Sequence, residues 1–135
     1  MKHIRLISLV FVLLVLAFCG CENIEIPVIT EPKAVETSPT VVDLSAVMTS
    51  KQIDEYGVVY SAKSKNPSLS SNDGKVSGTL DANGLFTATL TLATNTTYYF
   101  VFFATNEVGT ATSVPVELKT SLYTPNVDDN PFPNP

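Results

Sequence analysis

The spacing of apolar residues between positions 40 and 120 is the strongest constraint on what this sequence can fold into. Short β-branched and aromatic runs are separated there by turn residues, and no stretch shows a helical period. Residues 85–92 are the clearest case, because every second residue is apolar and threonines fill most of the other positions. Such alternation predicts a strand with one apolar face and one threonine-lined face. The chain therefore favours an all-β fold.

Turn residues divide this region into segments of strand length. We expect strands at residues 41–49, 55–61, 75–80, 85–92, 97–106 and 110–120. With a first edge strand in the proline-rich segment before residue 40, they predict a seven-stranded antiparallel β-sandwich. Asp81 to Gly84 predict a compact turn, since Asn and Gly tolerate positive φ. Pro115 marks the last strand as an edge or a bulge, because proline cannot donate to a ladder.

The first twenty residues have the pattern of an export signal. Lys2 and Arg5 precede an apolar run over residues 6–18, which as a helix covers about 20 Å and is too short for a hydrocarbon core of about 30 Å. The run ends in Gly20-Cys21, a small residue immediately before a cysteine. This segment resembles the signal peptides of bacterial lipoproteins, which are cleaved before the cysteine.

That resemblance implies that the Cys21 thiol carries a diacylglyceryl group and that its amine is acylated. The protein would then be lipid-anchored in a Gram-negative outer membrane and would face the periplasm or the cell surface. Several acyl chains anchor a protein far more firmly than one. The alternative is an ordinary secreted protein with an incidental cysteine at its cleavage site.

The mature composition argues against catalysis and against nucleic-acid binding. Without Lys2 and Arg5, six basic and thirteen acidic side chains remain, a net charge of about −7 that repels phosphate backbones. The mature chain has no His and no cysteine apart from Cys21, so imidazole and thiol mechanisms are excluded. The sequence also lacks a calcium-binding loop. We expect no enzyme, no catalytic or metal-binding residue, and no cofactor besides the lipid.

Residues 92–106 resemble the E–F corner and strand F of fibronectin type III domains, a family with an immunoglobulin-like sandwich. In that family a Leu, a Thr and a Tyr recur at alternate positions, and the Tyr hydroxyl bonds back to the backbone of the corner. Leu92, Thr96 and Tyr98 fill these positions. Residues 56–61, 66–67 and 106–110 resemble strand C, its following loop and the F–G turn of the short variants found on bacterial surface lipoproteins.

The resemblance covers residues 40–120 and organises the whole chain. Residues 1–20 are the signal peptide, residues 21–39 the lipidated cysteine and a tether, and residues 40–120 the domain. Residues 121–135 form a tail rich in Pro, Asn and Asp, for which we expect disorder. The fold leaves function open, because this architecture serves unrelated roles.

A stripe of large apolar residues is the candidate binding surface. If the Tyr corner turns Tyr98 inward, then Tyr99, Val101 and Phe103 point outward, and Val59 extends the stripe where strands C and F pair. Such a stripe is covered by the tether, the 66–74 loop or the tail, or it binds a partner or a second copy. The remaining alternatives are that it is simply exposed or that the strand register differs from the one assumed. Tyr99 and Phe103 also suit the stacking of sugar rings.

The sequence thus predicts a non-enzymatic accessory module. It would recognise a surface protein or a polysaccharide through the outer face of strands C and F. The alternative is a structural spacer or an assembly subunit that acts by pairing through its edge strands.

Overall fold

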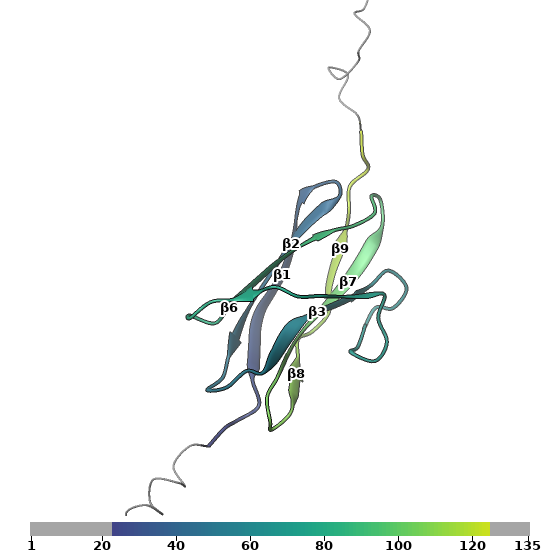
Figure 1. The fold of residues 1–135 in the computed structure, drawn as a ribbon. Helices are drawn as coiled ribbons and strands as arrows, with labels where there is room; N and C mark the ends of the chain where they lie inside the picture. Colours follow the sequence, from purple (N-terminus) through teal and green to yellow (C-terminus); the bar gives the residue numbers. More distant parts are fainter. Residues whose placement is uncertain (1–22, 125–135) are drawn as a thin grey trace, which may run out of the picture.

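Residues 23–124 form two antiparallel β-sheets in the computed structural model, which describes this range of the chain (Figure 1). Within this range there are nine strands and no helix. The apolar sides of the two sheets face each other and share one core. The all-β fold and the sandwich predicted from the sequence are confirmed.

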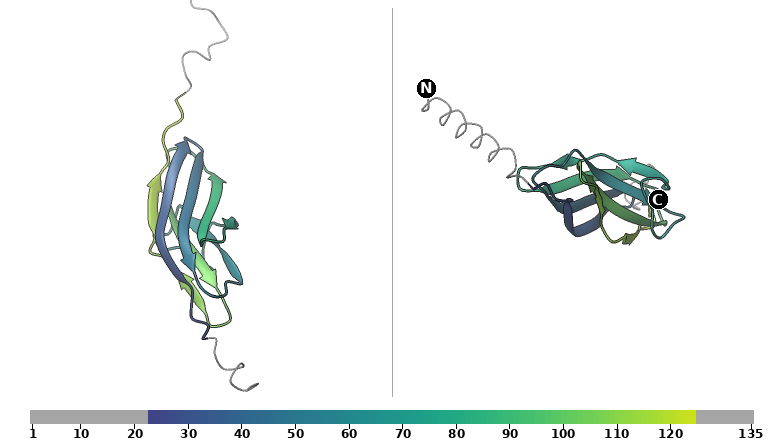
Figure 2. Two further views of the ribbon diagram at one scale, coloured as in Figure 1. Left: turned by 90° about the vertical axis from the view of Figure 1, so that its left-hand side faces the viewer. Right: turned by 90° about the horizontal axis from the view of Figure 1, so that it is seen from below.

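The first sheet has the order β1-β2-β6-β5 and the second the order β4-β3-β7-β8, with β9 also paired to β7. Figure 2 shows strands of the first sheet side by side in its left-hand view and the domain from below in its right-hand view. The strand bounds are Val28–Ser38 (β1), Val41–Thr49 (β2), Glu55–Ser61 (β3), Gly74–Val76 (β4), Thr79–Leu80 (β5), Leu85–Thr91 (β6), Thr97–Thr105 (β7), Thr110–Thr112 (β8) and Val116–Lys119 (β9).

Seven strands were expected and nine are found, because two expected segments are divided. The segment at 75–80 becomes β4 and β5, which belong to different sheets, with Gly78 between them. A side chain at position 78 would collide with the Thr87 carbonyl and the Phe86 ring, so the crossing point has room only for glycine. The segment at 110–120 becomes β8 and β9, which pair with two parts of β7 and are separated at Pro115. The prediction of an edge or bulge at Pro115 is confirmed.

Strand β1 lies on the N-terminal side of the start predicted for the domain. It pairs with β2 from Val28 to Ser38, with a register shift between Thr30 and Lys33. Glu31 in that shift has a φ of 53°, and Pro32 follows it. A bulge and a proline are devices that prevent an edge strand from pairing further. Most of the expected tether therefore belongs to the sandwich, which starts near residue 28 rather than 40.

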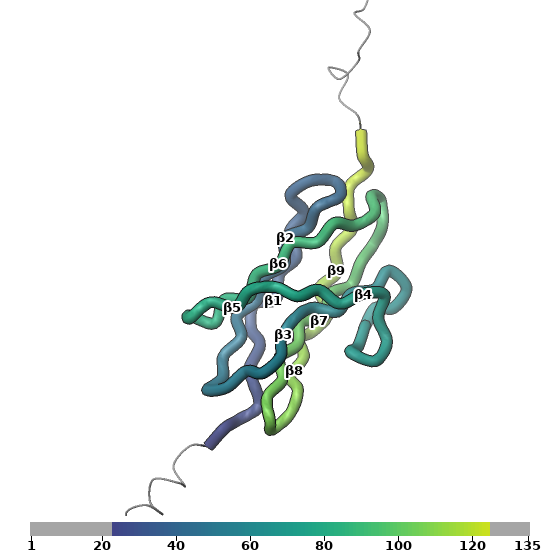
Figure 3. Tube along the Cα trace, viewed as in Figure 1, coloured from purple at the N-terminus to yellow at the C-terminus, as the bar shows by residue number. Residues whose placement is uncertain are grey.

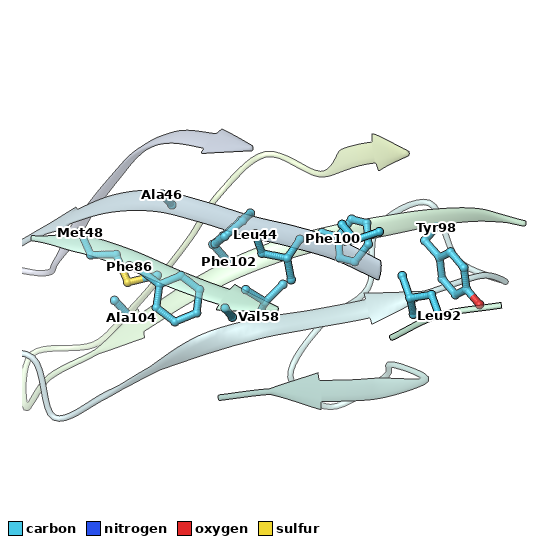
Figure 4. Packing of buried hydrophobic residues seen from close by; sticks show 12 residues of the cluster. Leu44, Ala46, Met48, Val58, Phe86, Leu92, Tyr98, Phe100, Phe102 and Ala104 are labelled. Atoms are coloured by element: carbon cyan, nitrogen blue, oxygen red, sulfur yellow. The ribbon is translucent and has the colours of Figure 1, made fainter. Parts of the chain in front are cut away.

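The core consists of side chains that alternate inward from both sheets (Figure 4). Phe86 from the first sheet meets two rings from the second in edge-to-face contacts, Phe102 at 5.9 Å and Tyr56 at 6.0 Å between centroids. Rings prefer such contacts to face-to-face stacking. The inward residues of β6 are those that the alternation at 85–92 predicts, so the period-two prediction is confirmed.

The described ends of the chain leave the sandwich at opposite poles (Figure 3). Residues 23–27 enter beside the 50–54 loop and the 106–109 turn, at what we call the N-terminal pole. Residues 121–124 leave beside the corner at residues 93–96, at the C-terminal pole. A pull on one end is therefore transmitted along the length of the domain.

Replacing Phe86 by Ala should lower the free energy of unfolding by about 3–5 kcal/mol, because its ring has no exposed surface and a cavity would remain. Its neighbour Leu85 is 42% exposed on the opposite face, so Leu85→Ala should cost less than about 1 kcal/mol. Urea unfolding followed by circular dichroism measures both changes. Equal costs for the two variants would contradict this assignment of the faces.

Candidate functional site

The predicted stripe lies where β3 and β7 pair on the side of the second sheet that faces away from the core. The register places Val59 opposite Val101 and Gly57 opposite Phe103. Tyr98, one position before Tyr99, points into the core. The structure therefore brings the four predicted residues together on one face, as the Tyr-corner argument requires.

The stripe is not an open surface. Val59, Val101 and Phe103 are only 1%, 3% and 0% exposed and form a second apolar cluster, and Tyr99 is half-buried. A partner cannot reach a phenyl ring with no exposed surface unless the domain rearranges. The hypothesis of an accessible recognition face is therefore corrected for Val59, Val101 and Phe103, which form a second layer of packing, whereas part of the Tyr99 side chain stays exposed.

Lys75 on β4 covers part of this cluster. The backbone of Lys75 lies opposite Val59, and its ammonium group is 4.9 Å from the centroid of the Phe103 ring. The same ammonium forms an ion pair with Glu55. A cation over a ring face is attracted by the ring quadrupole, while the aliphatic stem of lysine packs on apolar surface. The sequence did not predict this role of Lys75. Alternation along β4 indicates the face to which Lys75 points, but it does not indicate that Val59 and Phe103 are its neighbours across the sheet.

The loop between β3 and β4, residues 62–73, is exposed except at one residue. Pro67 at its middle is fully buried. Asp73 closes the loop, because its carboxylate accepts hydrogen bonds from the Ala62 N–H at 2.8 Å and the Ser61 hydroxyl at 3.0 Å. These two bonds hold the pKa of the Asp73 carboxyl below its ordinary value, and the nearby charge of Lys63 adds a smaller contribution.

Asp81 has a comparable role in the turn between β5 and β6, where its side chain accepts the N–H groups of Asn83 and Leu85. Gly84 in this turn has a φ of 86°, as the predicted turn requires. Among residues 23–124, no three His, Asp or Glu side chains are placed to hold a metal ion.

The described parts of the tether and the tail bind elsewhere. Asn106, 5% exposed, donates to the Glu25 carbonyl at 2.6 Å and so fixes the N-terminal segment at its own pole. Ser121 donates from its backbone and its hydroxyl to the Glu36 carboxylate on β1. The third segment that the sequence offered as a cover, the 66–74 loop, leads into β4, whose Lys75 lies over the Phe103 ring.

The predicted corner residues lie together at the C-terminal pole. The Tyr98 hydroxyl accepts the Ala93 N–H at 3.2 Å, and Leu92 is 8% exposed beside it. Thr96 donates its hydroxyl to the Thr94 carbonyl and its N–H to the Thr120 hydroxyl. Thr120 also donates to the Ala93 carbonyl, so it ties the last strand to the corner. Sequence reasoning missed this buried threonine, because its partners lie more than twenty residues away.

Cys21 lies outside the described residues, as do residues 125–135 of the expected tail. Within the described range, no helix has the length and apolarity that a membrane crossing needs. Two hollows of about 330 and 480 Å³ adjoin each other at Thr49 and Ser50, near the N-terminal pole.

Comparison with known proteins adds no relative: no family model, no curated protein and no solved structure matches this chain.

Replacing Phe103 by Ser should destabilise the domain by about 3–5 kcal/mol, the range for removing a buried phenyl ring. A substitution at this position therefore tests packing and not recognition. Val114→Ser is the matched control, because Val114 is 71% exposed and its loss should change stability by no more than about 0.5 kcal/mol. Urea midpoints measure both, and a Phe103→Ser midpoint equal to that of the control would contradict the second layer.

Replacing Asp73 by Ala should lower the melting temperature at neutral pH, because two hydrogen bonds that close the loop are lost. Since the folded-state pKa is depressed, the stabilisation is present above the ordinary pKa of aspartate, about 3.9, and is lost as the pH falls through the folded value. The gap in melting temperature between wild type and variant should therefore narrow below about pH 4. Glu107→Ala removes an exposed carboxylate as the control. A gap that is unchanged down to pH 2 would contradict the assignment.

Proposed function

We propose that this chain is a non-enzymatic, lipid-anchored module of a Gram-negative outer membrane. In this proposal the acylated Cys21 holds the N-terminal pole at the membrane, and the sandwich is a rigid spacer that carries the C-terminal pole away from it. The observation that carries the spacer role is that the described chain ends leave at opposite poles (Figure 3). The lipid anchor rests on the resemblance of residues 1–21 to lipoprotein signal peptides.

We further infer that the sandwich is of the fibronectin type III, immunoglobulin-like type. Its support is the corner bond from the Ala93 N–H to the Tyr98 hydroxyl, together with the pairing of β3 with β7 and of β1 with β2. If β4 with β5, and β8 with β9, each count as one interrupted strand, residues 23–124 hold seven strand segments.

Spacing is favoured over edge pairing as the structural role. The edge strands β4 and β5 have three and two residues, β1 carries a bulge with Pro32, and β8 is separated from β9 at Pro115. Short and interrupted edges offer little ladder to a second chain. The sequence suggested recognition of a surface protein or polysaccharide through the β3–β7 face. Because most of that face is buried, we assign this recognition to the C-terminal pole instead.

Leu122 and Tyr123 are the residues we assign to that recognition. They are 65% and 62% exposed and adjacent, at the end of the domain farthest from the proposed anchor. Large apolar side chains gathered on a monomer surface favour contact with a partner. A photo-crosslinking amino acid at position 122 should yield a discrete adduct on intact cells, whereas the same group at exposed position 114 should not. Identical adduct patterns at the two positions would remove this assignment.

The anchor has a test of its own, with a control that the sequence supplies. Cys21→Ala should move the full chain from the membrane fraction to the soluble fraction, because the acylated thiol is lost. Cys19→Ala should leave it in the membrane, since Cys19 is expected to be removed with the signal. Fractionation and the intact mass of the processed chain are the measurements. An unmodified sulfur at position 21 in the wild type would end the proposal.

A further inference from the structure

The N-terminal pole is held together by one buried side chain. The Asn106 amide donates to the carbonyls of Glu25 at 2.6 Å and Gln52 at 3.2 Å, and its oxygen accepts the Val108 N–H at 2.9 Å. One residue therefore joins the incoming chain, the 50–54 loop and the 106–109 turn. Pro27 is buried just after the first of these contacts. The chain is thus fixed from Glu25 onward.

Three aliphatic side chains are exposed at this pole: Ile26 at 48%, Val28 at 54% and Val108 at 50%. Ile26 lies against the 106–109 turn, since its Cδ1 would be 3.5 Å from a Cβ at Gly109. Ile26 and Val28 also line the hollow of about 480 Å³. We call Ile26, Val28 and Val108 the aliphatic patch of the N-terminal pole. Single exposed aliphatic residues are ordinary, but three gathered around one end of a small domain form a surface.

The position of this patch is set by the chain that precedes it. Only four virtual bonds separate the Cα of Cys21 from that of Glu25, so they span at most about 15 Å. The polar layer of one bilayer leaflet is about 5–7 Å thick. Whenever Cys21 is acylated, the fixed start of the domain lies within reach of the headgroups. A long tether, as the sequence suggested, would not impose this proximity.

We propose that the aliphatic patch of the N-terminal pole contacts the membrane interface. The sandwich then stands on the bilayer with its N-terminal pole in the headgroup layer. This inference rests on the proposed lipid anchor and adds a surface of the protein to it. The occupant is a phospholipid interface, because it is the surface that the acylated cysteine brings within about 15 Å of Glu25, the residue next to Ile26 of the patch.

The charges of the pole indicate which property of the lipid is recognised. Glu25 and Glu107 are exposed around the patch, with Lys51 as the exposed cation beside the hollow. Such a set gives no net attraction to anionic headgroups. We therefore expect contact through the aliphatic groups, and zwitterionic vesicles should suffice.

The test uses the full-length, processed and acylated protein in phosphatidylcholine vesicles. An environment-sensitive fluorophore is attached through Val108→Cys at the N-terminal pole or, as the control, through Leu122→Cys at the opposite pole. Lipids with brominated chains should quench the label at 108 by about twofold, because interfacial groups lie about 5–10 Å deep, and should leave the label at 122 unchanged.

A second pair of variants separates contact by the patch from mere proximity. Val28→Ser should reduce the quenching at 108, whereas Val35→Ser, a 55% exposed valine on the same strand but away from the pole, should not. Both positions are exposed, so urea midpoints close to that of the parent show that the fold is intact.

The outcomes distinguish the two proposals. If the intact mass shows an unmodified Cys21, the lipid anchor fails and the inference fails with it. If Cys21 is acylated but the labels at 108 and 122 are quenched equally or not at all, the anchor stands and the membrane contact is overturned. Quenching at 108 that Val28→Ser leaves unchanged also overturns it, because the short chain alone would then account for the position.

Discussion

The contact between Phe86 and the two rings of the opposite sheet determines how the layers of this protein fit together. Residues 23–124 contain no cysteine, so no disulfide can staple this range, and its two sheets are joined by packing. Phe86 has no exposed surface and touches Phe102 and Tyr56 edge-to-face. Figure 4 shows Phe86 and Phe102 in the core between the two sheets. Because these rings pack edge-to-face, the sheets cannot slide without opening a cavity. The strand register on both sides is consistent with this one arrangement.

The second apolar layer changes how the molecule can be used. Val59, Val101 and Phe103 are aromatic or aliphatic on a face that would normally meet water, and they are nevertheless buried. Lys75 covers part of this cluster, and its ammonium group lies over the Phe103 ring and pairs with the Glu55 carboxylate. The outer face of the second sheet is therefore structural around β3 and β7, and the edges of the sandwich are short or interrupted. The two poles carry the exposed aliphatic and aromatic side chains that the proposals use.

The two poles are built on different local chemistry. At the N-terminal pole a buried amide, Asn106, satisfies three backbone groups of separate segments, and so fixes a chain entry that would otherwise fray. At the C-terminal pole two hydroxyls, those of Tyr98 and Thr120, fix the corner and the chain exit. A domain clamped at both entry and exit is suited to hold its two ends at a constant separation, which is the property a spacer requires.

Alternation, turn chemistry and the corner motif were sufficient to predict the all-β class, the bounds of β2 and β3, the turn at 81–84 and the grouping of Tyr99, Val101, Phe103 and Val59 on one face. These features depend on neighbours in sequence, whose spacing fixes the side to which a strand residue points. Tertiary structure alone decided that this face is covered, that the first edge strand starts as early as Val28, and that Gly78 passes the chain from one sheet to the other. Each of those features depends on contacts between residues far apart in sequence, such as that of Lys75 with Phe103 or of Asn106 with Glu25. The local pattern of apolar and polar residues cannot predict which distant segment packs on a given face.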